Sequence, residues 1–166
     1  MKKYKFVAIS GSLRKESYNT KLLRTVQGML PQNITLEHLS IDDVPLYNAD
    51  IHDEHVPESV DKLLDAIKAA DALLFFTPEY NYSVPGVLKN VIDHISSSPK
   101  KPFEMKPIGM MGASTSLLET ARAQYHLRQM MVANNAYVFN KPGVMIAEAK
   151  KKFDKDGNLT DKNAEN

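Results

Sequence analysis

Short apolar segments alternate with segments of helical periodicity along the whole chain, and this alternation restricts the fold more than any other feature. Five segments have the pattern of strands: 4–10, 34–39, 72–77, 107–111 and 137–147, the last of them interrupted at Pro142-Gly143. Four segments have apolar residues at helical spacing: 19–30, 60–67, 85–95 and 117–132. Because strands and helices alternate through short connections, we expect parallel strands with helices on both faces of the sheet.

This arrangement predicts an α/β flavodoxin-like fold, a doubly wound, five-stranded parallel sheet with strand order 2-1-3-4-5. The 166 residues suffice for one domain with one substantial core. We expect residues 1–147 to form this domain. Residues 148–166, in which Phe153 and Leu159 are the only larger apolar residues, are expected to be a polar C-terminal tail, and residues 42–56 a polar loop.

The composition excludes several classes of function. The chain has no cysteine, which excludes disulfides, thiolate metal sites, iron–sulfur ligation and the cysteine nucleophile of phosphatases with a similar topology. A formal net charge of +1 provides no field that would attract nucleic acid or an anionic membrane. No window approaches the about 18 apolar residues of a membrane span, and the N-terminal apolar run is too short for a signal peptide. We therefore expect a cytoplasmic protein that binds neither nucleic acid nor membranes.

Ligands of a doubly wound sheet bind beyond the carboxyl ends of the strands, so the loops after the first, third and fourth strands form the candidate site. The first loop, 10–20, places polar side chains before a helix: Ser12, Arg14, Ser17, Asn19 and Thr20. Free N–H groups at a helix start attract anions and arginine binds phosphate, so a phosphate monoester is the natural ligand. The alternative is a helix start that Ser17 or Asn19 caps without a ligand. The glycine-rich fingerprints of dinucleotide-binding and P-loop proteins are absent.

The second loop, 77–86, combines two tyrosines with a carboxylate, an amide and a hydroxyl between a buried strand and a helix. Tyr80 and Tyr82 offer stacking faces for a planar, partly polar ring, and the backbone N–H groups offer donors. Alternatively, both tyrosines pack over the edge of the sheet. The third loop, 112–116, has small residues that let a flat ligand approach the backbone, but alone it is more typical of a capped turn.

Three stretches, GSLRKESYN, PEYNYSVPGVLKNVIDHIS and ARAQYHLRQ, resemble the NADPH-dependent FMN reductase family, which includes bacterial quinone, azo-dye and chromate reductases. The resemblance extends from about Lys5 to Asp161. It implies that residues of the first loop hold the FMN phosphate, namely Ser10, Ser12, Arg14, Ser17, Asn19 and Thr20. It implies that residues of the second loop cradle the isoalloxazine ring, namely Pro78, Glu79, Tyr80, Asn81, Tyr82 and Ser83. Ser114 and Thr115 of the third loop would lie near the ring.

The resemblance also implies an activity. Hydride from NADPH or NADH reduces the flavin, and a small acceptor such as a quinone, an azo compound or free flavin then replaces the nicotinamide, in a ping-pong mechanism. No side chain is required as acid, base or nucleophile, because the flavin performs the chemistry. In this family the helices expected at 85–95 and 117–132 form the dimer, so we expect a homodimer or homotetramer.

The chain departs from the family pattern in two places. Ser116 and Glu119 stand where glycines are expected, which affects how closely the third loop approaches a flavin or a nicotinamide. Most relatives continue into a final helix, which we expect to be missing here.

Other functions of the same fold make different demands on the sequence. A flavodoxin-type electron carrier also binds FMN, but it turns over no substrate of its own and tends to be acidic, whereas this chain is near neutral. A receiver domain needs acidic residues at the ends of the first and third strands, where this chain has Ser10 and Thr77.

Two clusters contain residue types that bind metals: Asp50, His52, Asp53, Glu54 and His55 in one, and Asp154, Asp156 and Gly157 in the other. Neither has the ligand spacing of a zinc or calcium site. We interpret both as solvated polar turns and expect no metal.

Overall fold

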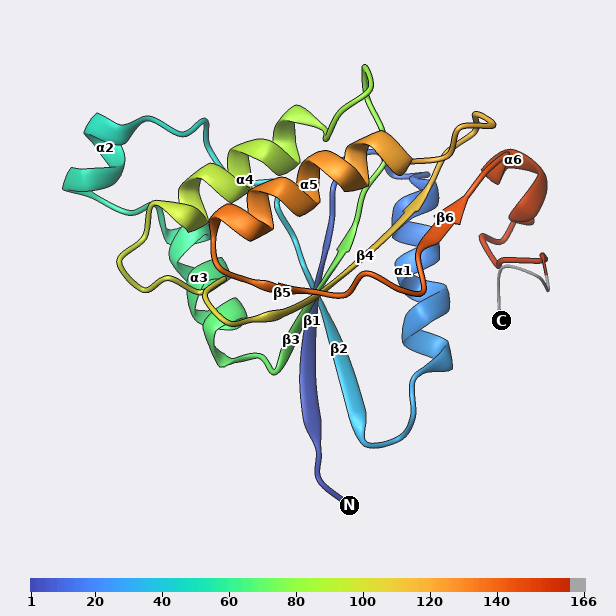
Figure 1. Ribbon diagram of the computed structural model, residues 1–166, viewed down its shortest axis with the longest axis horizontal. Helices are drawn as coiled ribbons and strands as arrows, with labels where there is room; N and C mark the ends of the chain where they lie inside the picture. The colour runs from blue at the N-terminus through green and yellow to red at the C-terminus, as the bar shows by residue number, and fades with distance from the viewer. Residues whose placement is uncertain (162–166) are drawn as a thin grey trace.

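The structure is a parallel sheet with helices on both faces (Figure 1). It is a computed structural model that describes residues 1–161, and of residues 52–54 the backbone only. Its strands are β1 (Tyr4–Ser10), β2 (Ile34–Leu39), β3 (Ala72–Phe76), β4 (Pro107–Ala113), β5 (Tyr137–Val138) and β6 (Val144–Ile146). The order is β2-β1-β3-β4-β5, β6 pairs with β4, and all these pairs are parallel. The predicted fold and the strand order 2-1-3-4-5 are therefore confirmed.

The last predicted strand is divided in two. Strand β5 pairs with the start of β4, where Tyr137 lies opposite Pro107, and β6 pairs with its end, where Val144 lies opposite Met111. Pro142 lies between the two strands and has no N–H group to offer a neighbouring strand. The interruption falls where the sequence predicted it.

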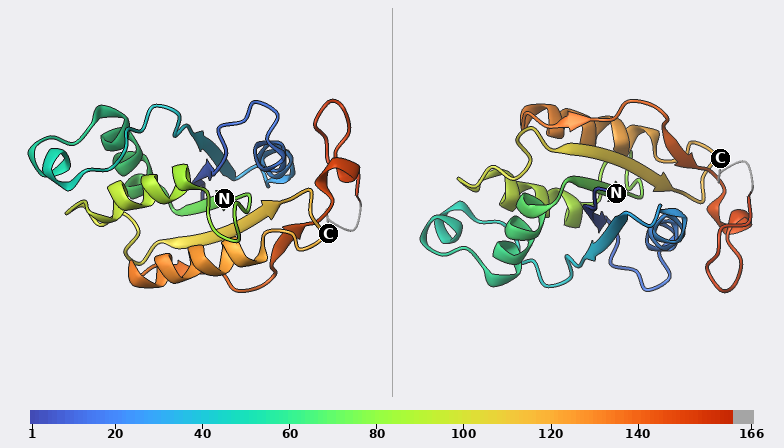
Figure 2. Two further views of the ribbon diagram at one scale, coloured as in Figure 1. Left: turned by 90° about the horizontal axis from the view of Figure 1, so that it is seen from above. Right: turned by 90° about the horizontal axis from the view of Figure 1, so that it is seen from below.

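The helices are α1 (Tyr18–Met29), α2 (Ala49–Glu54), α3 (Glu58–Ala69), α4 (Gly86–Ser96), α5 (Ala121–Ala133) and α6 (Ala149–Lys152), and all except α2 form two layers that cover the sheet (Figure 1). Helices α3, α4 and α5 lie on one face, and α1 and α6 lie on the other (Figure 2). Side chains alternate along a strand, so Val7 and Ile9 of β1 join the first hydrophobic cluster and Ala8 joins the second. Within residues 1–161, no helix is long and apolar enough to cross a membrane.

The segment after residue 147 packs against the domain, although its polar composition predicted a tail. Ala149, Phe153 and Leu159 are buried in one cluster with Leu22 and Leu23 of α1. The overall composition did not predict this packing, because the few apolar residues of the segment are the ones that face the domain.

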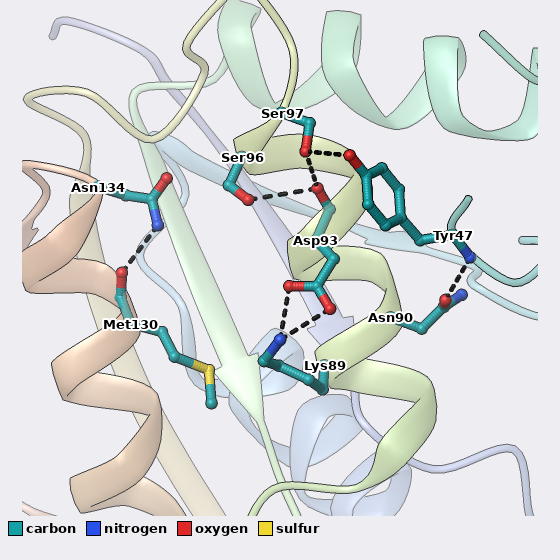
Figure 3. Close-up of polar contacts among 8 residues, drawn as sticks. All are labelled: Tyr47, Lys89, Asn90, Asp93, Ser96, Ser97, Met130 and Asn134. Carbon is teal, nitrogen blue, oxygen red and sulfur yellow. Dashed lines mark hydrogen bonds and ion pairs between the residues drawn. The ribbon is translucent and has the colours of Figure 1, made fainter. Parts of the chain in front are cut away.

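The segment 42–56, predicted to be a polar loop, contains the short helix α2 and is bonded to α4 (Figure 3). Asn48 caps α2 through its side chain. The N–H of Tyr47 donates to Oδ1 of Asn90 at 2.8 Å, and the Tyr47 hydroxyl accepts from the hydroxyl of Ser97 at 2.9 Å. The cap of α2 and the bonds to α4 order this segment. The sequence did not predict this order, because such polar contacts produce no apolar periodicity.

Helix α5 begins at Ala121, four residues later than the periodicity predicts for the segment 117–132. Glu119 has a φ of 58°, in the left-handed region, which a right-handed helix cannot include. The residues before Ala121 therefore belong to the loop after β4, and this lengthens the loop beside the candidate site.

Candidate active site

The three loops at the carboxyl ends of β1, β3 and β4 meet around a cavity of about 120 Å³. Its lining comes from all three loops: Ser12, Arg14, Ser17, Tyr18 and Asn19 from the first, Pro78, Glu79 and Tyr80 from the second, and Ala113, Ser114 and Thr115 from the third. This is the position at which a doubly wound sheet binds ligands. Predicted residues from each loop thus lie at one place, although the sequence separates them by about a hundred positions.

The first loop presents hydroxyls and a cation to the cavity. Arg14 is exposed, and its Nη2 reaches the carbonyl of Glu16 at 3.3 Å, which leaves other guanidinium donors for a ligand. The Ser17 side chain caps α1 by accepting from the N–H of Thr20 at 3.4 Å, so its own proton is free to be donated. Ser17 therefore caps the helix as the alternative expected, and a capping hydroxyl of this kind can still bind an anion. Ser12 lines the same cavity.

Three predicted residues of this loop, Ser10, Asn19 and Thr20, have side-chain bonds that hold the loop in shape. The Ser10 hydroxyl is buried and lies 2.9 Å from the hydroxyl of Thr20. Asn19 is also buried, and its amide makes two bonds to Ala113 at the end of β4: Nδ2 donates to the carbonyl at 3.0 Å, and Oδ1 accepts from the N–H at 2.9 Å. Asn19 therefore connects the first loop to the third.

The second loop ends in a tight hairpin. The N–H of Tyr80 donates to the carbonyl of Ser83 at 3.0 Å, and the reverse bond is also 3.0 Å. Asn81 and Tyr82 between them have φ values of 49° and 66°, so both are left-handed, as in a type I′ turn. The rings of Tyr80 and Tyr82 are exposed, by 46% and 66%. Packing over the sheet edge, the alternative to a binding role, does not describe them.

Glu79 links the second loop to the start of α5. Its carboxylate is only 6% exposed and accepts from the N–H groups of Arg122 at 3.0 Å and Ala123 at 3.2 Å. The same carboxylate accepts from Nε of Arg122 at 2.6 Å and is paired with its Nη2. The hydrogen bond that Arg122 donates to the Glu79 carboxylate raises the pKa of Arg122 above its usual range. A carboxylate with this many partners holds the helix in place, and it is not free for a ligand.

Arg122 and His126 continue this link to the tip of the hairpin. The Arg122 guanidinium lies over the Tyr82 ring, 3.6 Å from its centroid. The Ser83 hydroxyl lies 2.9 Å from Nδ1 of His126, one turn further along α5. Asn81, Tyr82 and Ser83 lie outside the cavity lining, on the hairpin beside it.

The sequence matches the model of the family described as NADPH-dependent FMN reductase over residues 4–151. The chain belongs to this family. An NAD(P)H-dependent FMN reductase of Pseudomonas aeruginosa is 48% identical over 160 residues, which are 96% of this chain and 86% of that protein. A quinone reductase of Escherichia coli is 43% identical over 154 residues, 92% of this chain and 82% of that protein.

Among solved structures, the flavoenzyme NAD(P)H:(acceptor) oxidoreductase FerB from Paracoccus denitrificans superposes with a TM-score of 0.89. It is 32% identical, and the match covers 98% of this chain and 89% of that one. The predicted family is confirmed, and with it an oxidoreductase that uses FMN and NAD(P)H.

The third loop shows what the departure from the FMN reductase pattern means structurally. Glu119 occupies a left-handed conformation that glycine adopts without steric cost, which explains why a glycine is expected there. Position 112 requires glycine for a different reason, which is lack of space. A Cβ at this position would lie 2.1 Å from Oγ1 of Thr120 and 2.6 Å from the carbonyl oxygen of Thr77. The loop therefore keeps the close packing at its start and carries a strained residue near its end.

Four residues of the site were not predicted. Tyr18 and Ala113 line the cavity, and Arg122 and His126 hold the second loop. The available signal was the stretch ARAQYHLRQ, which carried the family resemblance and contains both α5 residues.

The two clusters of residue types that bind metals are interpreted as solvated polar turns. Within the described side chains, no group of three or more His, Asp or Glu is arranged to hold an ion. The side chains of His52, Asp53 and Glu54 lie outside the described residues. The carboxylate of Asp154 accepts from the N–H groups of Asp156 and Asn158, at 2.9 and 2.8 Å.

Larger cavities lie elsewhere in the molecule. One of about 810 Å³ lies between β2 and α3, and another of about 550 Å³ follows the sheet face where Tyr4, Ala72 and Pro107 begin their strands. Neither is at the carboxyl ends of β1, β3 and β4. The smaller cavity is the candidate because of its position and its polar lining.

Proposed function

We propose that the protein is an NAD(P)H-dependent reductase of quinones or similar small acceptors, such as azo compounds and free flavin, and that it holds FMN at the three loops around the 120 Å³ cavity. One observation carries the proposal. Hydroxyls and a guanidinium from the first loop converge at the carboxyl ends of β1, β3 and β4, directly beside an exposed tyrosine hairpin.

The cavity fits the phosphate end of FMN. Ser12, Ser17 and Arg14 supply donors, and the amino end of α1 adds favourable electrostatics for an anion. A volume of about 120 Å³ is below the roughly 300–1,000 Å³ of pockets that enclose a whole ligand, so the ring would lie outside it. The faces offered to the ring are Tyr80, Tyr82 and the loop of Ser114 and Thr115.

The remaining predicted residues hold the loops in position. Ser10, Asn19 and Thr20 keep the first loop in shape, and Glu79 holds the second loop against α5. Pro78, Asn81 and Ser83 set the path of the second loop. When bound, FMN would supply the hydride and electron transfer. The chain itself needs only to bind the flavin, orient it and leave one face of its ring accessible.

A flavodoxin-type electron carrier is the competing function. Both named relatives are reductases, at 48% and 43% identity, and this supports a protein with substrate turnover of its own. The experiment that separates the two functions is NADPH oxidation by the purified FMN-bound protein with a quinone present. A carrier would bind FMN and oxidise no NADPH.

We further propose a homodimer or homotetramer whose contacts involve α4 and α5, in the cytoplasm, where NAD(P)H is available. Large apolar side chains are exposed on and after α5: Tyr125, Val132, Tyr137 and Phe139. Aromatic residues at the surface are enriched in interfaces. Sedimentation at micromolar concentration tests the assembly, and a single active species at the 18.6 kDa chain mass contradicts it.

A further inference from the structure

The segment that follows β6 is bonded to the third loop. The N–H of Ser114 donates to the carbonyl of Ile146 at 2.9 Å, and the N–H of Ala149 donates to the carbonyl of Ser114 at 2.9 Å. The N–H of Glu148 donates to the carbonyl of Ser116 at 3.2 Å. These bonds fix the backbone of Ser114, which lines the cavity.

The same segment packs against the start of α1. The ring centroids of Phe153 and Tyr18 lie 5.6 Å apart, with the planes at 40°. Phe153 is buried, and it shares a hydrophobic cluster with Leu22 and Leu23. Tyr18 is the first residue of α1 and lines the cavity. One aromatic contact therefore connects the segment to the first loop.

Internal bonds make this segment a defined unit. The N–H of Thr160 donates to the carbonyl of Lys152 at 2.8 Å, which closes the turn between them. Within the turn, the Asp154 carboxylate accepts from Nδ2 of Asn158 at 3.0 Å and from its N–H at 2.8 Å. The hydrogen bonds from Asn158 lower the pKa of Asp154 below its usual value.

We infer that residues 146–161, named here the brace, hold the first loop in position against the third loop through the contact of Phe153 with Tyr18, and thereby set the affinity for the FMN phosphate. The bonds between Asn19 and Ala113 tie the two loops beneath the cavity, and the brace ties them from outside. A binding site loses efficiency when its groups move by more than about 0.5 Å, so a looser brace weakens phosphate binding. Phe153 is a positioning residue, because it acts through Tyr18.

The inference rests on the proposed FMN site, and the test separates the two. Dissociation constants for FMN and riboflavin, measured by fluorescence titration of apoprotein, are compared in the natural chain and in Phe153→Ala. We expect Phe153→Ala to weaken FMN about tenfold, the effect of losing one hydrogen bond to phosphate, and riboflavin less than about twofold. Phe153→Leu keeps most of the apolar volume and loses the ring contact, so it should give an intermediate FMN affinity and serves if the alanine variant does not fold.

Phe103→Ala is the matched control. Phe103, like Phe153, is a buried ring that packs against a second ring, because its centroid lies 6.4 Å from that of Phe75. Phe103 belongs to the hydrophobic cluster on the other face of the sheet. Phe103→Ala should lower the midpoint of urea unfolding as Phe153→Ala does, and it should leave the FMN dissociation constant unchanged. The inference is wrong if Phe153→Ala weakens the binding of FMN and riboflavin equally, or if Phe153→Ala and Phe103→Ala weaken FMN binding equally. If the natural chain itself binds no FMN, the proposed function fails instead.

Discussion

The two walls of the cavity are held in place by different means. Contacts within the first loop hold it in place, namely the Ser17 cap and the hydrogen bond between Ser10 and Thr20. The bonds of Asn19 then attach the loop to the end of β4. The second loop is fixed from outside, because its anchor, Glu79, binds the start of α5 more than forty positions further along the chain. The wall that would hold the phosphate therefore combines local contacts with one long-range tie to the end of β4, and the wall that would hold the ring depends on α5.

The largest expected effect comes from breaking the anchor of the second loop. Glu79→Ala removes the carboxylate that caps α5 and leaves Arg122 without its partner, so we expect the free energy of unfolding to fall by about 3 kcal/mol. Arg122 is 33% exposed, and water compensates part of its lost pairing. Urea unfolding of the apoprotein measures the effect.

Glu79→Gln sharpens this prediction. Glutamine keeps one oxygen that can accept from the two N–H groups of α5, but its NH2 group cannot accept from Arg122, so only the ion pair is lost and the loss should be about 1 kcal/mol. Equal losses in both variants would mean that the ion pair with Arg122, and not the helix cap, carries the stabilisation.

The next effect concerns the opposite wall. Arg14 is exposed and makes one weak bond to a carbonyl, so Arg14→Ala should leave stability almost unchanged. Loss of a charge-assisted bond to phosphate, worth about 1.5–3 kcal/mol, should weaken FMN about 10- to 150-fold. Riboflavin lacks the phosphate and should bind as before. If both flavins weaken equally, Arg14 acts on the shape of the loop.

The contrast between the walls also explains what could be predicted from the sequence. Strand order, the position of the site and the polar residues of the first loop follow from short-range patterns, because apolar runs and a capped helix start are local features. The roles of Glu79 and Asn19 do not follow from them, because each side chain bonds backbone that lies far away in the sequence. The burial of Phe153 was missed for a similar reason, since composition averages over the positions that face inwards.

A smaller effect is expected at the tip of the hairpin. Tyr82 is 66% exposed and left-handed, and its ring contacts the Arg122 guanidinium. Tyr82→Gly should change the free energy of unfolding by less than about 1 kcal/mol, because the relief of backbone strain offsets the lost cation–π contact. Flavin fluorescence and kcat/KM should change more than stability. A large fall in the melting temperature of the apoprotein with unchanged kinetics would mean that the ring serves packing only.

The smallest effect tests the residue that departs from the family pattern. Glu119 has a φ of 58°, and a left-handed conformation costs a residue with a side chain about 1–2 kcal/mol relative to glycine. Glycine also gains freedom in the unfolded chain, which offsets about 0.5–1 kcal/mol of that relief. Glu119→Gly should therefore stabilise the protein by about 0.5 kcal/mol, whereas Glu119→Ala retains the strained backbone and should bring no gain. Urea unfolding of the two variants side by side separates the backbone effect from loss of the charge. A gain of equal size in both would assign it to the carboxylate, and the glycine expected at this position would then need an explanation other than backbone conformation, such as the approach of a ligand to the loop.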